Sequence, residues 1–277
     1  MNRTPLAGRI AQYVALAAYM VFLAFPLLWL LSVSLKSPAE LASVSPHLIP
    51  RGFDFGNYVE AFTQQGLPGA AWNSTVVAIG SMLLTIVVAL PAAYALGRFR
   101  SVLGPIATMW ILVSQVFPVV LIAIPLFMII RGIGLLNTLP GLILVYLVWT
   151  LPFALWMLRG YVSALPIELE EAAAVDGASR PRILLSVVLP LLRPGIIATA
   201  MFAFISAWNE FFFALVLLKS DTLTLPLVLA RFVGAEGKVS LGPLAAASVF
   251  ATLPSLAIFA IVQRRLTSGL LAGAVKG

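Results

Sequence analysis

The chain has 277 residues, of which 61% are hydrophobic and 10% are charged; its formal net charge is +7 and its mean hydropathy is +1.06. Soluble globular domains carry about 25% charged residues, so this composition excludes an ordinary soluble domain and indicates a protein that lies in a lipid bilayer. The absence of cysteine excludes disulfides and thiolate metal sites, and the single His47 cannot form a metal-binding cluster.

Six stretches of the chain are apolar for longer than the roughly 20 residues that a helix needs to cross the hydrocarbon core. The first, Ile10–Leu35, has 26 residues without a charge, and the fifth is interrupted only by Glu210. We therefore expect an all-α membrane protein, a single transmembrane domain over residues 1–277. The expected spans are 10–35, 72–97, 104–130, 138–158, 195–218 and 242–263.

The first apolar stretch follows Arg3 and Arg9, as the apolar region of a secretory signal follows basic residues. That region is only about 7 to 15 residues long in a signal peptide, and no small-residue cleavage site closes this one. We expect a retained transmembrane helix.

The distribution of basic residues predicts the orientation of the spans. If both termini lie on one side of six spans, that side receives 11 of the 17 basic residues, namely Arg3, Arg9, Arg98, Arg100, Arg159, Arg180, Arg182, Arg193, Arg264, Arg265 and Lys276. The positive-inside rule then predicts cytoplasmic termini in a multi-pass membrane protein. The positive charge is accounted for by topology, so no nucleic-acid partner is expected. The polar segments 36–62 and 219–242 are expected outside, the first with little regular structure.

Proline lies inside most of the expected spans, at Pro26, Pro91, Pro118, Pro125, Pro152 and Pro254. Each proline removes a backbone donor and tends to kink its helix. One interpretation is a set of bent helices around a cavity that opens and closes. The alternative is that proline is simply commoner in membrane helices than in soluble ones.

The cytoplasmic connection 159–193 is too long, at 35 residues, for a plain connector. Pro166 suits the first turn of a helix, and Gly177 supplies the left-handed residue that commonly ends one. Ser179 can cap a second helix that continues to Pro190. We therefore expect a helix over 166–175, a tight turn and another helix, standing out from the membrane face.

The surface of this expected hairpin is small at Ala172, Ala173 and Ala174, which lets the backbone of another protein approach closely. Glu171 and Asp176 beside the alanines can accept hydrogen bonds or pair with basic groups. A short helix offered to a groove is a common recognition mode. The alternative is a hairpin that rests against the lipid surface with its carboxylates in water.

The hairpin also carries the pattern Glu, Ala, Ala, three residues, Gly, nine residues, a branched aliphatic residue, one residue, Leu, Pro. The residues are Glu171, Ala172, Ala173, Gly177, Val187, Leu189 and Pro190. This pattern resembles the coupling-loop signature of the membrane subunits of binding-protein-dependent ABC importers, which usually have Ile where Val187 stands. "AWNEFFFAL" (207–215) and "GLLAGAVKG" (269–277) resemble segments of the carbohydrate branch, in permeases of the maltose-transporter type, and "GLLAGAVKG" resembles the tail of the shorter membrane subunit.

The resemblance implies a permease subunit of an ATP-driven importer of mono- or oligosaccharides, in the inner or plasma membrane of a bacterium or archaeon. It implies three kinds of protein partner: a second homologous permease subunit, a dimer of cytoplasmic ATPase subunits that bind ATP and Mg²⁺, and an extracytoplasmic sugar-binding protein. Closure of the ATPase pair would move the coupling loop, including Ala174 and Asp176, and turn the pathway from inward-facing to outward-facing. Membrane lipid is the surrounding partner, and this chain itself is expected to bind no cofactor and no metal.

Two further sets of residues are candidates for function. Trp208, Asn209 and Glu210 combine an aromatic face with hydrogen-bonding groups inside an apolar stretch, which suits contact with a sugar or a gate; alternatively, they tie the fifth helix to its partner subunit. The segment 264–277 is expected as a C-terminal tail. The resemblance implies that its end, Gly273, Ala274, Val275, Lys276 and Gly277, contacts the ATPase subunits, and a frayed terminus is the alternative.

Other functions lack the residues that they require. No stretch fits the phosphate-binding loop G-x-x-x-x-G-K-[ST], the nearest being "GAEGKVS" from Gly234, so this chain is not expected to be an enzyme or to hydrolyse ATP. A secondary transporter should place ionisable residues at several midplane positions, and this chain offers essentially Glu210 alone. A membrane enzyme should show a constellation of reactive residues, and none is visible. Within transport, an importer of glycerol phosphate, polyamine or another small solute is the alternative to a sugar importer.

Overall fold

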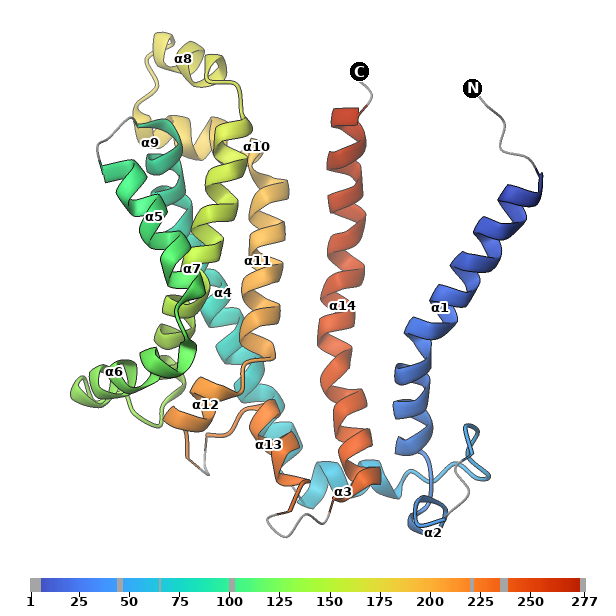
Figure 1. The fold of residues 1–277 in the computed structure, drawn as a ribbon. Coiled ribbons are helices and arrows are strands. Elements are labelled where there is room, and N and C mark those ends of the chain that lie inside the picture. Colours follow the sequence, from blue (N-terminus) through green and yellow to red (C-terminus); the bar gives the residue numbers. More distant parts are fainter. Residues whose placement is uncertain are drawn as a thin grey trace. The chain divides into compact units, whose positions relative to one another are not determined.

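The computed structural model describes residues 6–43, 47–64, 66–99, 103–219, 222–234 and 239–274, and within these ranges it is helical without a named strand (Figure 1). A single bridge joins Val233 and Val239. The helices are α1 (Leu6–Ser34), α2 (Pro38–Leu41), α3 (Gly56–Gln64), α4 (Leu67–Arg98), α5 (Leu103–Val116), α6 (Val119–Gly132), α7 (Leu139–Ala164), α8 (Glu168–Val175), α9 (Arg180–Ile183), the π-helical turn η1 (Leu184–Val188), α10 (Leu189–Leu191), α11 (Arg193–Trp208), α12 (Phe212–Leu217), α13 (Leu225–Arg231) and α14 (Leu241–Ala274).

Among the described residues, four helices are long and apolar enough to cross a membrane, namely α1, α4, α7 and α14 up to Gln263. The number rises to six if each of two bent helix pairs is one span. Each of these helices or pairs overlaps one expected span, and the expected all-α membrane fold is confirmed. α4 and α7 are longer than the spans expected at 72–97 and 138–158. α14 continues as far as Ala274, into the segment 264–277 that we expected as a tail.

The third expected span, 104–130, is not one straight helix. α5 and α6 have 14 residues each and meet at a bend of 104°. The bend occurs at Phe117 and Pro118, where Pro118 is extended with a ψ of 121°. Proline disfavours the helical conformation of the residue before it, so the two residues together end α5. The proline that we interpreted as a kink therefore breaks the span.

The fifth expected span, 195–218, is also interrupted. α11 ends at Trp208, and α12 begins at Phe212 after a break of three residues. At its other end, α11 meets the helical segment 180–191 at a bend of 79°. The hairpin segment and the membrane helix that follows it therefore run in different directions.

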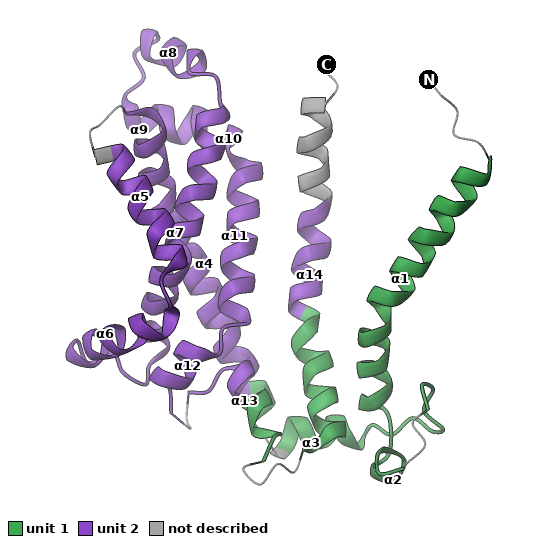
Figure 2. Cartoon of the chain, in the orientation of Figure 1, with its two compact units in different colours: residues 1–68, 228–253 green, residues 69–227, 254–277 purple. Residues whose placement is uncertain are grey.

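The chain divides into two compact units, residues 1–68 with 228–253 and residues 69–227 with 254–277 (Figure 2). In unit 1, the segment expected to have little regular structure contains α2 and α3. The Asn57 side chain on α3 is buried and donates hydrogen bonds to the carbonyls of Ser34 (3.1 Å) and Lys36 (2.8 Å). These bonds fix α3 to the end of α1. In the most apolar part of α1, a stretch of 18 residues, no residue is buried by the rest of the chain.

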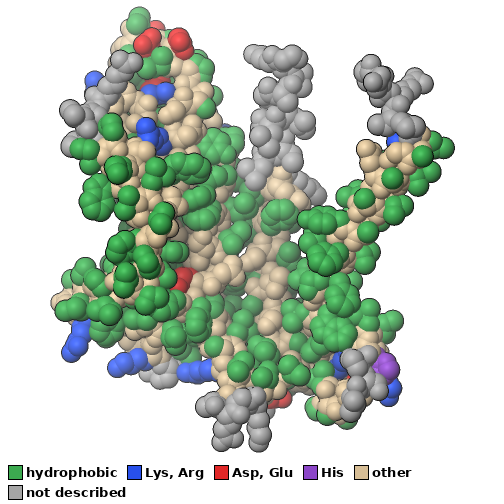
Figure 3. All heavy atoms as spheres, viewed as in Figure 1, with side chains coloured by type: hydrophobic (Ala, Val, Ile, Leu, Met, Phe, Trp, Pro, Cys, Tyr) green, Lys and Arg blue, Asp and Glu red, His purple; other side chains and the backbone are tan. Residues whose placement is uncertain are grey.

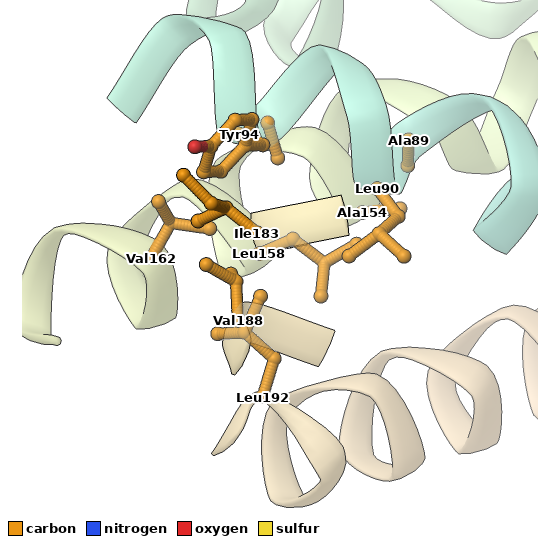
Figure 4. Close-up of a cluster of buried hydrophobic side chains, with 10 residues drawn as sticks. Ala89, Leu90, Tyr94, Ala154, Leu158, Val162, Ile183, Val188 and Leu192 are labelled. Atoms are coloured by element: carbon orange, nitrogen blue, oxygen red, sulfur yellow. The ribbon is translucent and has the colours of Figure 1, made fainter. Parts of the chain in front are cut away.

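Unit 2 is built around α4, α7 and α11. Its buried cluster joins α4, α7 and the segment 183–192, as Figure 4 shows. The cluster members are Ala89, Leu90, Ala93, Tyr94, Ala154, Leu158, Val162, Ile183, Val188 and Leu192. At Gly97, a Cβ atom would lie 2.8 Å from a methyl carbon of Val162, so α4 and α7 approach closely there. Within unit 2, α8 lies at the end away from α6 and α12 (Figure 1).

Candidate coupling hairpin

The hairpin comprises residues 168–191 and begins with α8. The first turn of α8 carries Glu168, Glu170 and Glu171, whose negative charge is favourable at the positive end of a helix dipole. α8 ends at Val175, and two residues later Gly177 has a φ of +82°, the left-handed conformation predicted from the sequence. The amide of Gly177 donates to the carbonyl of Ala174, and the amide of Ala178 donates to the carbonyl of Ala173. The distance is 3.0 Å in both hydrogen bonds. This pair of bonds is the helix ending that a left-handed glycine permits.

The second half of the hairpin is helical from Arg180 to Leu191, but not uniformly so. Ser179 occupies the position before the first helical residue, as expected, yet its side chain makes no capping hydrogen bond. Residues 184–188 form a π-helical turn, and the amide of Leu189 donates to the carbonyl of Leu184. Pro190 lies two residues beyond this turn. Proline has no amide hydrogen to donate to the preceding turn. A π-helical turn just before the proline lets the helix accommodate this missing hydrogen bond.

The hairpin has an outer and an inner face. Its outer face is exposed and includes Glu171, Ala172, Ala174, Asp176 and Gly177, together with the apolar side chains of Leu169 and Val175. In the space-filling view of Figure 3, acidic side chains gather around α8. The inner face packs on the buried cluster through Ala173, Val187 and Leu189, which are partly buried. Of the signature residues, Glu171, Ala172 and Gly177 are exposed, whereas Ala173, Val187 and Leu189 hold the hairpin to the membrane helices.

Glu170 differs from the other carboxylates of the hairpin because it is buried. Its two oxygens accept hydrogen bonds from the Tyr94 hydroxyl (2.7 Å) and from Nε of Arg98 (2.5 Å). Arg98 also donates from Nη2 to the carbonyl of Leu165 over 2.9 Å. We call these three side chains, Tyr94, Arg98 and Glu170, the network. The sequence analysis did not predict this network. One signal was present: Glu170 lies three residues before Ala173, so the two residues share one face of α8.

A second contact joins α4 to the other half of the hairpin. The guanidinium of Arg180 lies over the ring of Phe99, 4.9 Å from its centroid. The Phe99 ring in turn meets Tyr94 edge-on, with centroids 6.0 Å apart. The end of α4 therefore contacts both helices of the hairpin.

The residues proposed for a substrate pathway lie at the break between α11 and α12. The Glu210 carboxylate accepts hydrogen bonds from the amides of Phe213 (2.9 Å) and Ala214 (3.2 Å), so it caps α12. Trp208 is buried and stacks on Phe204 at a centroid distance of 5.7 Å. Asn209 is exposed, and its side-chain amide donates to the carbonyl of Ile205 in the preceding turn.

Of the five candidate residues at the C-terminus, Gly273 and Ala274 form the end of α14. Val275, Lys276 and Gly277 lie outside the described residues. Within the described part of the chain, no three His, Cys, Asp or Glu side chains gather as metal ligands would.

The comparisons with known proteins agree on the family. Residues 86–271 match the family model for the inner membrane component of binding-protein-dependent transport systems. The chain is 58% identical over 229 residues to a putative ABC transporter permease protein, ORF1, of Streptomyces antibioticus, covering 82% of this chain and all of the relative. It is 36% identical to the diacetylchitobiose uptake system permease protein DasC of Streptomyces coelicolor, over 98% of this chain and 99% of the relative. It is 34% identical to the trehalose/maltose transport system permease protein MalG of Thermococcus litoralis, over 99% of each.

A solved structure shows the same fold. A chain of a bacterial ABC transporter involved in the import of the acidic polysaccharide alginate superimposes with a TM-score of 0.80, covering 95% of this chain and 99% of that one at 24% identity. The family match, the full-length relatives and the shared fold lead to one conclusion. The chain belongs to the family of inner membrane components of binding-protein-dependent transport systems and is an ABC transporter permease subunit.

Proposed function

We propose that this chain is one of two membrane subunits of an ATP-driven importer of sugars, and that the outer face of its hairpin binds a cytoplasmic ATPase subunit. The observation that carries the proposal is the division of the hairpin into two faces. Ala172, Ala174 and Gly177 form a patch of small residues on the outer face, beside the exposed Val175, while Ala173 and Glu170 turn inward. A helical hairpin that exposes small, acidic and apolar side chains together is suited to a groove on another protein.

In the proposed assembly, the ATPase pair binds ATP and Mg²⁺, and its closure moves the hairpin of each membrane subunit. A second, homologous permease completes the pathway, and an extracytoplasmic binding protein delivers the sugar. Both termini lie in the cytoplasm, as the excess of basic residues on that side favours. Sugar as the solute is supported by the names of the relatives, which specify diacetylchitobiose and trehalose or maltose uptake.

Binding of the ATPase is tested by co-purification with a tagged copy of the chain, expressed with the neighbouring reading frames. Those frames should include a second permease of six to eight helices and an exported binding protein. Ala172→Trp places a bulky ring on the outer face and should abolish co-purification of the ATPase. Ala164→Trp changes an alanine that is also exposed but lies outside the hairpin, and should leave co-purification intact. Equal recovery of the ATPase with both variants would contradict the proposed contact.

The solute is tested in proteoliposomes that contain the complete transporter and its binding protein. We expect ATP-dependent accumulation of at least one of labelled trehalose, maltose and N,N′-diacetylchitobiose. Glycerol 3-phosphate and spermidine represent the alternative solute classes. Accumulation of either of these, with none of the three sugars, would overturn the assignment to sugars.

The C-terminal contact is a separate part of the proposal. Deletion of residues 273–277 should change the rate of ATP hydrolysis by the assembled transporter, since the tail is proposed to reach the ATPase subunits. An unchanged rate would favour a frayed terminus without that role.

A further inference from the structure

The attachment of α8 to the membrane helices depends on few side chains. Of its eight residues, only Ala173 packs against the buried cluster, and only Glu170 is buried. A methyl group offers little surface to resist sliding of the helix. By contrast, Glu168 and Glu171 are exposed. Glu170 is therefore the main side-chain contact between α8 and the rest of unit 2.

The groups that hold Glu170 come from a single helix. Tyr94 and Arg98 are four residues apart on α4, so they share one face, and each donates to a different oxygen of the carboxylate. Arg98 and Glu170 have side chains that are 9% and 11% exposed. Breaking a buried pair by removing one charge leaves the other uncompensated, and hydrogen bonds to charged groups are stronger than those between neutral groups. The network therefore fixes both the position and the orientation of α8 on α4.

Arg98 also joins a third element. It is the last residue of α4, where a positive charge is favourable at the helix C-terminus, and it donates to the Leu165 carbonyl just after α7. The ends of α4 and α7 are thereby held together at the point where the chain enters the hairpin. Two hydrogen bonds to a charged group thus join α8 to α4.

We infer that Arg98 and Glu170 are positioning residues that transfer movement of the hairpin to α4, so that ATP hydrolysis drives the change in the membrane pathway only while the network is intact. This inference rests on the proposed function, because it presupposes an ATPase that moves the hairpin. Apolar packing keeps the hairpin attached to the membrane helices, while the network makes α4 follow the movement of the hairpin.

The test compares Glu170→Gln with Glu168→Gln in the reconstituted transporter, with the sugar that the unmutated transporter accumulates from the three named above. Glu170→Gln keeps the shape of the side chain but removes its charge and one acceptor. Glu168→Gln makes the same change on the same helix at an exposed position. For Glu170→Gln we expect hydrolysis of ATP to continue and the ATP consumed per sugar accumulated to rise at least about fivefold, the lower end of the usual range for coupling between sites. For Glu168→Gln we expect no change.

A distance measurement detects the same effect without a solute. The chain has no cysteine, so spin labels can be placed at Leu169→Cys on α8 and Val87→Cys on α4, both exposed positions. In the otherwise unmutated chain, the distance distribution between the labels should be the same without nucleotide and with Mg·ATP and orthovanadate. With Glu170→Gln added, the distribution should shift or broaden between the two states.

A double variant separates transfer of movement from stability. Arg98→Met with Glu170→Met removes both charges, and replacement of a buried pair by apolar side chains often preserves stability. We expect normal assembly with the ATPase but the same rise in ATP consumed per sugar. If assembled Glu170→Gln or the double variant transports as economically as Glu168→Gln, with an unchanged label distance, the inference is wrong. If the unmutated chain recruits no ATPase, the proposed function is wrong and the inference fails with it.

Discussion

The hydroxyl oxygens of Thr85 on α4 and Thr150 on α7 lie 2.8 Å apart, and both side chains are buried. Thr150 also donates to the Tyr146 carbonyl in its own helix over 2.8 Å. The proton of Thr85 is thus directed to Thr150, and that of Thr150 to its own backbone. This is the one hydroxyl–hydroxyl bond between α4 and α7 in the described part of the chain, and it lies within two membrane-spanning helices.

Thr85→Val should weaken the contact between α4 and α7 while keeping the side-chain volume. Hydrogen bonds between membrane helices contribute about 0.6 kcal/mol on average and seldom more than about 2 kcal/mol. We expect a decrease of that order in the free energy of unfolding, measured by titration with denaturing detergent. Thr75→Val is the matched control, because the Thr75 hydroxyl bonds only to the Ala71 carbonyl of its own helix. Equal losses in both variants would show that the contact between the helices contributes nothing specific.

Gly195 should tolerate no side chain. A Cβ atom there would lie 2.5 Å from Cγ of the Tyr161 ring, so α11 and α7 would have to separate. Overpacking of this kind costs about 1 to 3 kcal/mol. Gly195→Ala should lower the unfolding midpoint, whereas Gly160→Ala should not, because a Cβ at Gly160 meets nothing within 4 Å. Addition of Tyr161→Ala to Gly195→Ala should relieve the clash, and failure to recover stability would point to another cause.

Gly177→Val should impair transport without a steric clash, because a Cβ at Gly177 has open space around it. The cost arises from the φ of +82°, which a branched residue adopts only with strain of about 1 to 3 kcal/mol. We expect the turn of the hairpin to change and ATP hydrolysis to become uncoupled from uptake, with assembly at least partly retained. Gly177→Asn is the control, because asparagine enters this conformation more readily. Normal uptake by Gly177→Val at normal expression would disprove this role.

Glu210→Ala should affect stability more than solute affinity, because the carboxylate caps α12. Loss of a capping side chain costs about 0.5 to 2 kcal/mol. The unfolding free energy should fall accordingly, and the sugar concentration that gives half-maximal uptake should stay the same. Glu210→Gln keeps one acceptor oxygen, so its unfolding free energy should lie between those of the unmutated chain and Glu210→Ala. A raised half-maximal concentration at unchanged stability would instead assign Glu210 to the sugar site.

The hairpin was predictable because its ends are determined locally. Glycine adopts the left-handed conformation at the end of a helix without help from distant residues, so Gly177 indicates where α8 stops. The acidic residues of the first turn likewise favour the start of a helix without any distant partner. The role of Glu170 was not predictable in the same way. Its partners on α4 are 72 and 76 residues away in the chain, and only folding brings them together.

The number of apolar stretches was also predictable, but their course was not. Hydropathy measures how long a stretch remains apolar and carries no information on its direction. Pro118 was visible in the sequence, yet a proline can kink a helix or end it, and the outcome depends on what the neighbouring segments allow. The same limit applies to the break after Trp208, where the capping role of Glu210 depends on the position of α12.

The bend between α5 and α6 has a consequence for the surroundings of this segment. Each of the two helices is about 21 Å long at 1.5 Å per residue, shorter than the roughly 30 Å hydrocarbon core. A helix end exposes up to four carbonyl or amide groups without partners in the helix. Lipid tails offer these peptide groups no hydrogen bonds. The backbone at Phe117 and Pro118 must therefore face protein or water in the working transporter. At this position, polar peptide groups are exposed within an otherwise apolar segment.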